Sequence, residues 1–274
     1  MGKIMKVIGV MGIMGMSSCH MGNMSKGMEV VKLEERGTVA LVGVDYRKYD
    51  MRQPEHIAYC SGVWVDEGHI LTAGHCVEGE LERLKDHAEK IKENKPKCEG
   101  LGLALGLCEE EEDKGVELEL EGMEVRYITS QESEGVGVEP SGEHIGRVIS
   151  IDKGKDLALI AARGHAIPLH YSARVGERGK IGEKVYGCGH PGGVYFTYME
   201  GSISGYQSRI NGREMMLVQI PITFGNSGGP LFNEEGELIG IADLIMRGLG
   251  GEGFYLPANT IRSFLKDNEV KNEE

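Results

Sequence analysis

The stretch Gly225–Pro230, with the sequence Gly-Asn-Ser-Gly-Gly-Pro, most constrains what this chain can fold into. It lies between two strand-like apolar runs, Met216–Thr223 and Glu237–Leu244. Its three glycines allow tight backbone conformations that are closed to other residues. The turn therefore presents the hydroxyl of Ser227 clear of bulky neighbours, and the amides of Gly225 and Ser227 can converge on one point.

Such a turn has two interpretations. The first is structural, a hairpin turn rich in Gly, Ser and Asn. The second is catalytic, because acyl transfer needs a nucleophile that attacks a carbonyl and two N–H donors that stabilise the resulting oxyanion. The rest of the chain decides between them.

Length and charge narrow the classes of function. The chain has 274 residues, enough for one large or two small domains with a real core. Its formal net charge is −13 and its sequence pI is about 5.2. Phosphate binding needs a basic surface, so we expect no nucleic-acid partner.

The N-terminus has the pattern of an export signal. Met1–Lys6 carries two lysines, Val7–Met16 is apolar apart from glycines, and two serines precede Cys19. The apolar run is too short to span a bilayer, which takes ~20 residues. The segment resembles a bacterial lipoprotein signal, although Met16 stands where such signals usually have Leu, and Cys19 is then a candidate lipid anchor. The alternative is a buried or disordered N-terminus of a cytoplasmic protein.

The remainder indicates a β-rich body with one helical insertion and a C-terminal helix. Apolar residues recur at helical spacing over Glu78–Asn94, and a second, short helix is expected at Asn259–Lys266. Strand-like runs separated by turn signals occupy much of the rest. Those of the first half are Thr38–Val44, Ala58–Val65, His69–Ala73, Val116–Leu120 and Glu124–Ile128.

Two further residues can activate Ser227. A serine hydroxyl is a weak nucleophile unless an oriented base takes its proton. Among nine histidines, His75 stands out because a strand-like run ends at small residues immediately before it. Asp156 opens the apolar run Asp-Leu-Ala-Leu-Ile and can supply the orienting carboxylate, although a lone Asp before a strand is usually a turn residue.

These three segments together resemble trypsin-like serine proteases. Thr72–Cys76 resembles their Thr-Ala-Ala-His-Cys box with Gly74 in place of the second Ala, and Asp156–Ile160 resembles their Asp-Leu-Ala-Leu segment. Gly225–Pro230 matches their Gly-Asn/Asp-Ser-Gly-Gly-Pro box, and the order is the family's own. The resemblance implies two packed antiparallel six-stranded β-barrels with a His75–Asp156–Ser227 triad in the cleft, and an oxyanion hole formed by the amides of Gly225 and Ser227.

Within that family the chain is most similar to HtrA/Deg-type bacterial proteases, over Asn226–Asn233, Gly236–Ile241 and the turn at Gly187–Gly193. HtrA proteins usually carry a C-terminal PDZ domain; none follows here, so peptide-regulated assembly is not expected. The implied division is a signal peptide at 1–18, a linker at 19–36, a protease domain at 37–266 and a charged tail at 267–274. Its N-terminal barrel covers about 37–170 with an insertion at 78–143, and its C-terminal barrel covers about 178–257.

The cysteines favour disulfides over a metal site. None of the six forms a CxxC pair, so zinc is not expected. Some branches of the trypsin-like family have a disulfide beside the catalytic histidine. The resemblance to them implies a bridge between Cys60 and Cys76. Cys98 and Cys108 are the next pair, and Cys188 is expected to remain a partly buried thiol. The acidic block 109–113 is better explained as a solvated flap than as a Ca²⁺ site, so no metal or cofactor is expected.

The resemblance also bears on regulation and specificity. Trypsin-like zymogens place Asp where this chain has neutral Asn226, so no activating cleavage beyond signal removal is expected. The stretch around Pro221 and four apolar residues imply a small or medium aliphatic side chain at the cleaved position. Asp243 stands where the family usually has Ser or Thr, and we expect it to point to solvent rather than to alter the pH profile or recruit a basic group. The four pocket residues are Ile222, Leu244, Ile245 and Met246.

The leading hypothesis is therefore an exported serine endopeptidase that acts on proteins or peptides. Its only expected membrane contact is a lipid at Cys19, and the sequence does not indicate an oligomeric state. A catalytically silent homologue that acts as a binding or chaperone-like module in the cell envelope is the alternative.

Overall fold

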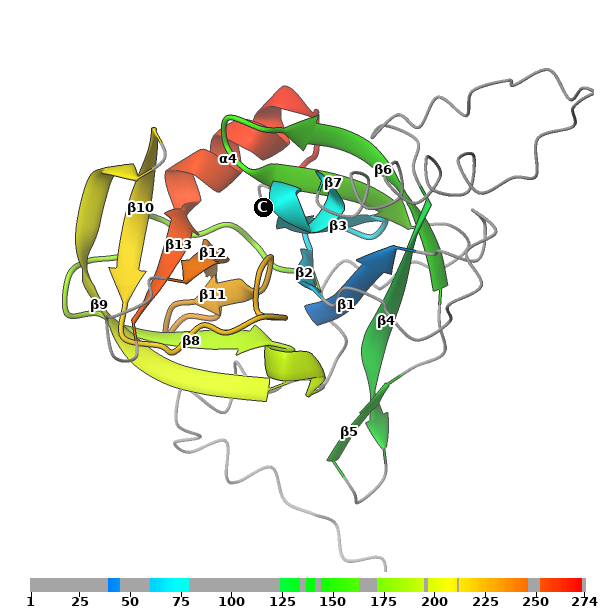
Figure 1. The fold of residues 1–274 in the computed structure, drawn as a ribbon, viewed down its shortest axis with the longest axis horizontal. Coiled ribbons are helices and arrows are strands. Elements are labelled where there is room, and N and C mark those ends of the chain that lie inside the picture. The colour runs from blue at the N-terminus through cyan, green and yellow to red at the C-terminus, as the bar shows by residue number, and fades with distance from the viewer. Residues whose placement is uncertain are drawn as a thin grey trace, which may run out of the picture.

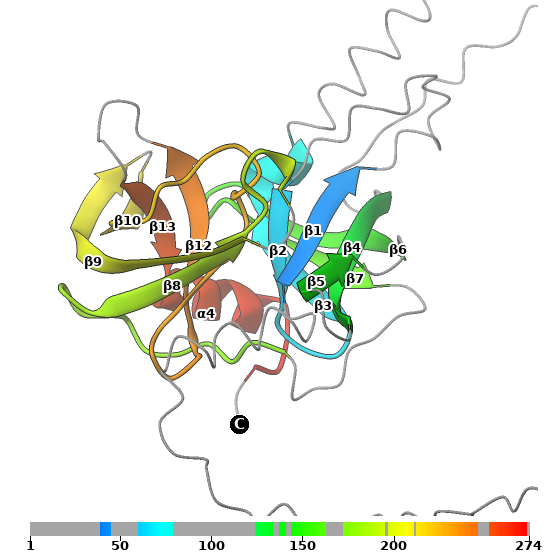
Figure 2. The ribbon, with the colours of Figure 1, turned by 90° about the horizontal axis from the view of Figure 1, so that it is seen from below.

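The structure is a computed structural model that describes residues 39–44, 60–78, 124–133, 137–140, 144–162, 172–194, 197–210, 212–245 and 252–272 (Figure 1). These residues form two β-structures that lie side by side, with a helix packed against them (Figures 1 and 2). No helix within these ranges is long and apolar enough to cross a membrane.

The N-terminal half is a seven-stranded antiparallel sheet in the order β1-β2-β3-β7-β6-β4-β5. β1 also pairs with β4, which returns the sheet on itself and leaves β5 as an extra strand on β4. The strands are β1 (Val39–Val44), β2 (Cys60–Trp64), β3 (His69–Ala73), β4 (Glu124–Ser133), β5 (Gly137–Pro140), β6 (His144–Asp152) and β7 (Leu157–Ala162).

The insertion expected at 78–143 is shorter than its sequence suggests. β4 begins at Glu124 and pairs with both β1 and β6, so the sheet resumes well inside that range. β4 and β5 form a hairpin within 124–140, which its acidic and glycine-rich sequence did not indicate. The expected helix at Glu78–Asn94 and the expected strand at Val116–Leu120 lie outside the described residues, apart from Glu78, which is helical.

The C-terminal half is a closed six-stranded barrel in the order β10-β13-β12-β11-β8-β9. This barrel confirms the expected all-β, chymotrypsin-like architecture for the second half of the chain. The short helix α4 (Ala258–Asp267) follows its last strand, within a residue of the expected bounds. The strands are β8 (Lys184–Gly189), β9 (Thr197–Ile210), β10 (Arg213–Val218), β11 (Pro230–Phe232), β12 (Leu238–Ile245) and β13 (Gly253–Pro257).

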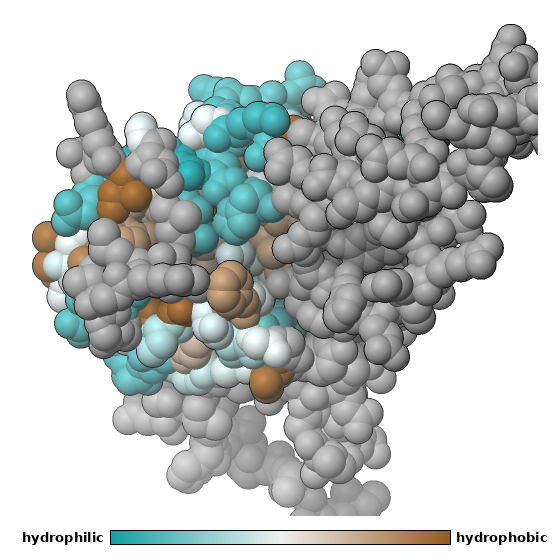
Figure 3. Space-filling model, viewed as in Figure 1, coloured by the Kyte–Doolittle hydropathy of each residue, from teal (hydrophilic) through white to brown (hydrophobic). Residues whose placement is uncertain are grey.

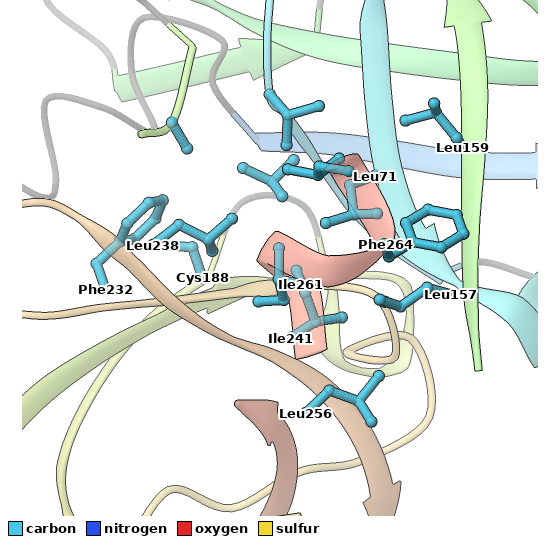
Figure 4. Close-up of a cluster of buried hydrophobic side chains, with 14 of the residues drawn as sticks. Leu71, Leu157, Leu159, Cys188, Phe232, Leu238, Ile241, Leu256, Ile261 and Phe264 are labelled. Atoms are coloured by element: carbon cyan, nitrogen blue, oxygen red, sulfur yellow. The ribbon is translucent and has the colours of Figure 1, made fainter. Parts of the chain in front are cut away.

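One apolar cluster joins the two halves (Figure 4). Leu71 and Leu157 enter it from the N-terminal sheet, and Ile241 enters it from the barrel. Ile261 and Phe264 on the inner face of α4 complete it, and both are fully or almost fully buried. Burial of such side chains stabilises the fold by about 1.5–3 kcal/mol each, so the cluster fixes β3 and β7 against β12.

Exposed large apolar side chains are few on the described surface. On the face shown in Figure 3, hydrophilic and hydrophobic residues are interspersed over the barrel. The large apolar side chains with the greatest exposure are Ile145, Ile149, Ile181, Val194 and Phe224.

Candidate active site

The pairing of β3 with β7 brings His75 and Asp156 together. Ala73 at the end of β3 is opposite Leu157 at the start of β7, so the residues just beyond these two ends become neighbours. Residues 74–78 form a helical turn that carries the imidazole, and Asp156 adopts a positive φ of 55°. Asp tolerates this left-handed conformation better than most residues.

Three hydrogen-bond contacts fix this pair. The Gly74 amide donates to the Asp156 carbonyl at 2.8 Å, and the His75 amide donates to Asp156 Oδ1 at 2.8 Å. His75 Nδ1 lies 2.9 Å from Asp156 Oδ2. A Cβ on Gly74 would lie 2.9 Å from Asp156 Oδ1, which gives a steric reason for glycine at this position.

The geometry determines the tautomer of His75. An ionised carboxylate only accepts hydrogen bonds, so Nδ1 carries the proton that faces Asp156. Burial alone would raise the pKa of Asp156, but the hydrogen bond and charge of His75, with contributions from Asp243 and Arg213, hold that pKa well below its usual range. Burial lowers the pKa of His75, yet the Asp156 contact and the charge of Asp243 outweigh burial and raise it.

A disulfide anchors the helical turn that carries His75. Cys60 at the start of β2 is bonded to Cys76, which confirms the predicted bridge. The Ser61 amide donates to the Ser227 carbonyl at 2.8 Å, so the same part of β2 also holds the glycine-rich turn. The thiol of Cys188 is more deeply buried than expected, with 2% of its surface exposed, and Cys98 and Cys108 lie outside the described residues.

The glycine-rich turn requires its glycines. Gly225 has a φ of 99°, and a Cβ there would lie 2.1 Å from the His190 carbonyl oxygen. Gly228 has a φ of 81°, and a Cβ there would lie 2.2 Å from the Ser61 carbonyl oxygen. The segment therefore packs against β2 and the end of β8, and the purely hairpin interpretation does not account for it.

The amides of this turn divide into two groups. The Gly228 amide donates to the Ala242 carbonyl at 2.8 Å, whereas the amides of Gly225 and Ser227 meet no acceptor among the described residues. The Gly192 amide donates to the Phe224 carbonyl at 2.6 Å. In a trans peptide the N–H points opposite to the C=O, so the Gly225 N–H faces away from Gly192.

A buried pair that sequence reasoning missed supports this turn. The Ser61 hydroxyl donates to the Gly225 carbonyl at 2.7 Å, and it lies 3.0 Å from the His190 amide and 2.9 Å from His190 Nδ1. A hydroxyl has a single proton; because Gly225 takes it, His190 Nδ1 must be the donor. Burial lowers the pKa of His190 to about 3, so this ring stays neutral.

The expectation for Asp243 is wrong. Its side chain is 0% exposed, and its Oδ1 lies 3.8 Å from His75 Nδ1. Arg213, which sequence reasoning also missed, lies between the two carboxylates. Its Nη1 is 2.9 Å from Asp156 Oδ2 and 3.4 Å from Asp243 Oδ2. Burial and the neighbouring Asp156 raise the pKa of Asp243 to about 7.

The predicted pocket residues are described only in part. Ile222 is 7% exposed, and a Cβ on Gly253 would lie 2.3 Å from its Cδ1, so Ile222 packs closely on the start of β13. Leu244 and Ile245 lie in β12, next to the buried Asp243 along the strand. The side chains of these two residues, and Met246 as a whole, lie outside what the structure describes.

Comparisons with known proteins agree with this arrangement. Residues 60–241 match the family model for a trypsin-like peptidase domain. A serine protease HtrA-like protein of Staphylococcus aureus (strain USA300) is 31% identical over 146 residues, which cover 47% of this chain but only 19% of that relative.

Two solved structures share the fold. A serine endoprotease from Yersinia pestis has a TM-score of 0.54 at 21% identity, with 91% of this chain and 68% of that chain covered. The protein Rv3671c from M. tuberculosis H37Rv also has a TM-score of 0.54, at 16% identity, with 89% of this chain and 92% of that chain covered.

Proposed function

The chain belongs to the family of trypsin-like peptidase domains, and from this premise we propose that it is a serine endopeptidase acting through Ser227, His75 and Asp156. The observation that carries the proposal is the double contact of Asp156 with the His75 amide and Nδ1, at 2.8 and 2.9 Å. That contact leaves Nε2 of a partly exposed imidazole as the nitrogen available for Ser227.

The proposed reaction has two stages. His75 Nε2 takes the proton of Ser227 Oγ as Oγ attacks the scissile carbonyl, and the imidazolium then gives that proton to the leaving amine. Water attacks the resulting acyl-enzyme with the same base assistance and releases the acid product. Asp156 holds the Nδ1–H tautomer and stabilises the imidazolium throughout.

The amides of Gly225 and Ser227 are the proposed oxyanion hole. Two features support this role: neither amide donates to an acceptor within the described residues, and the Phe224–Gly192 contact turns the Gly225 N–H away from Gly192. Loss of one such donor costs about 3 kcal/mol of transition-state stabilisation in related chemistry.

The proposed enzyme is competent without zymogen activation. Asn226 is 2% exposed and neutral, so its position in the turn does not depend on an ion pair with a newly formed N-terminal amine. We also propose a protease domain at 37–266 and export through residues 1–18, with Cys19 as the candidate lipid anchor. The two lysines of Met1–Lys6 and the short apolar run Val7–Met16 support the export proposal.

The proposed substrates are proteins or peptides with a small or medium aliphatic side chain at the cleaved position. Ile222 supports this preference, because the side chain that it contributes beside Gly253 is apolar. A panel of peptides with Val, Arg and Glu at the cleaved position tests it, and strong Arg preference would contradict it.

Labelling with a fluorophosphonate tests the proposed activity. Wild-type protein is expected to be labelled at one serine, and the Ser227→Ala variant is expected to lose the label. Ser202→Ala is the matched control, because this partly buried serine of β9 donates a hydrogen bond to the Gln219 side chain, has no part in the proposed triad and should leave labelling intact. Folded protein that takes no label would favour the alternative, a silent homologue that acts as a binding or chaperone-like module.

A further inference from the structure

Behind His75 lies a cluster of three charged groups, Asp156, Asp243 and Arg213, of which the reaction above uses only Asp156. Asp156 precedes β7, Asp243 lies in β12 and Arg213 begins β10, so three strands from both halves contribute. A ring nitrogen of His75 and one oxygen from each carboxylate lie within 4.8 Å of one another. Arg213 is only 15% exposed and is at ion-pair distance from both carboxylates.

The two carboxylates cannot both ionise easily at this distance. Like charges so close disfavour double ionisation, and burial adds to the penalty. Asp156 has the better donors, because it accepts from the His75 amide and faces the Nδ1 proton. Neither oxygen of Asp243 accepts a hydrogen bond from any described residue. The single proton of the pair therefore resides on Asp243.

Arg213 contributes its positive charge at short range. Its Nη1 lies 2.9 Å from Asp156 Oδ2 and 3.4 Å from Asp243 Oδ2, and this nitrogen has no aligned hydrogen bond to an acceptor among the described residues. A guanidinium remains protonated throughout the working pH range. It therefore balances whichever negative charge the two carboxylates carry.

We propose that Asp243 and Arg213 are positioning residues of this site: protonated Asp243 donates a hydrogen bond to Asp156, and Arg213 compensates the remaining charge, so that together they set the pH range in which His75 acts as a base. This inference rests on the proposed function for its kinetic consequences. The electrostatic coupling itself does not depend on proteolysis.

The sign of each contribution follows from charge. The groups that face Asp243 within the described residues are His75 after β3, Asp156 before β7 and Arg213 of β10. When Asp243 ionises, a second negative charge stabilises the imidazolium and raises the pKa of His75, whereas Arg213 lowers it. Near pH 7, where the pKa of Asp243 lies, a proton lost by the cluster can therefore come from Asp243 rather than from His75.

The test compares the full-length wild type with Asp243→Asn, Arg213→Gln and the double variant. The Asn amide keeps a hydrogen-bond donor to Asp156 but cannot ionise, so it isolates the charge. Glu214→Gln is the matched control, because Glu214 neighbours Arg213 in β10 but pairs with Arg178 at 2.6 Å. The two readouts are the pH profile of kcat/KM and the titration of the His75 imidazole by NMR.

Asp243→Asn is expected to move the acidic limb of the kcat/KM profile to lower pH. That limb should then report the loss of a single proton, the one on His75. Arg213→Gln is expected to move the limb to higher pH, with about a fivefold loss of kcat/KM at pH 6. The double variant should fall between these two, since it removes one charge of each sign, and Glu214→Gln should match the wild type. If Asp243 and Arg213 had a purely structural role, their replacement would lower kcat at every pH without moving the midpoint of the acidic limb.

Identical limbs and identical His75 titrations in wild type, Asp243→Asn and Arg213→Gln would overturn the inference. Where Asn destabilises the fold, Asp243→Ser offers a smaller hydroxyl donor for the same comparison. If the wild type takes no fluorophosphonate, the proposed function fails. The NMR titrations then still decide whether Asp243 and Arg213 act on His75.

Discussion

Asp156 holds His75 at two points, because one carboxylate oxygen accepts the His75 amide at 2.8 Å and the other lies 2.9 Å from Nδ1. The backbone contact fixes the position of the residue, and the side-chain contact fixes the tautomer and the ring plane. A base that must present Nε2 to a serine needs both.

Asp156→Asn is expected to lower kcat by about 10⁴-fold with little change in KM, because an amide that donates to Nδ1 selects the wrong imidazole tautomer. Steady-state kinetics on a peptide substrate measure this loss. Asp152→Asn serves as the control, since Asp152 pairs with Lys155 on the surface. A fall of less than tenfold would show that His75 does not depend on Asp156.

Ser61→Ala is expected to lower kcat by about tenfold, because the Gly225 carbonyl and both donors of His190 lose their shared partner. The buried groups left unsatisfied should also reduce the free energy of unfolding by about 1–3 kcal/mol. Kinetics and denaturant melts of the same preparation separate the two effects. An unchanged kcat in a destabilised variant would mean that the pair supports the fold but not the turn.

Replacement of both Cys60 and Cys76 by Ser is expected to reduce the free energy of unfolding by about 3 kcal/mol, the chain-entropy value for a loop of this length. Activity should also fall, because Cys76 follows His75 directly. Denaturant unfolding measures the first effect. Thiol labelling of unreduced native protein at either residue would contradict the bridge itself.

The pH dependence of stability should carry the signature of Asp243. Its pKa in the folded protein is about 7, above the ordinary carboxyl value of about 4. A raised carboxyl pKa stabilises the fold below the unfolded pKa, and this contribution is lost as pH rises through the folded pKa. Between these two values the wild type should lose about 1 kcal/mol per pH unit from this group.

Asp243→Asn should therefore gain stability relative to the wild type as pH rises from about 4 to 7. Asp156 has the opposite sign: its depressed pKa stabilises the fold above the ordinary carboxyl value and is lost in acid. Urea melts at several pH values measure both trends. A constant difference between variant and wild type across that range would contradict a buried, protonated Asp243.

The sequence was most informative where function depends on short contiguous segments. The segments at His75, Asp156 and Ser227 each carry a local pattern, and the structure brings the strand ends that carry His75 and Asp156 together. The bridge between Cys60 and Cys76 was predictable for the same reason. The tight turn at Gly225 and Gly228 was also predictable, because glycine adopts such backbone conformations far more readily than other residues.

The contacts that sequence reasoning missed all join distant segments through single side chains. An arginine at the start of β10 gives no local sign that it will neutralise a carboxylate in β12, so Asp243 was expected in solvent. Ser61 and His190 likewise become a pair only once β2 lies beside the end of β8. Such pairings depend on tertiary register, which a single sequence does not specify.

The central claim is that Ser227 is a nucleophile activated by His75, and the formation of an acyl-enzyme tests it most directly. Rapid mixing of the full chain with p-nitrophenyl acetate should give a burst of about one equivalent of product per chain, followed by slower turnover. The burst should vanish in Ser227→Ala and become much slower in His75→Ala. A folded wild-type protein that shows no burst, or a burst that persists in Ser227→Ala, would contradict the claim.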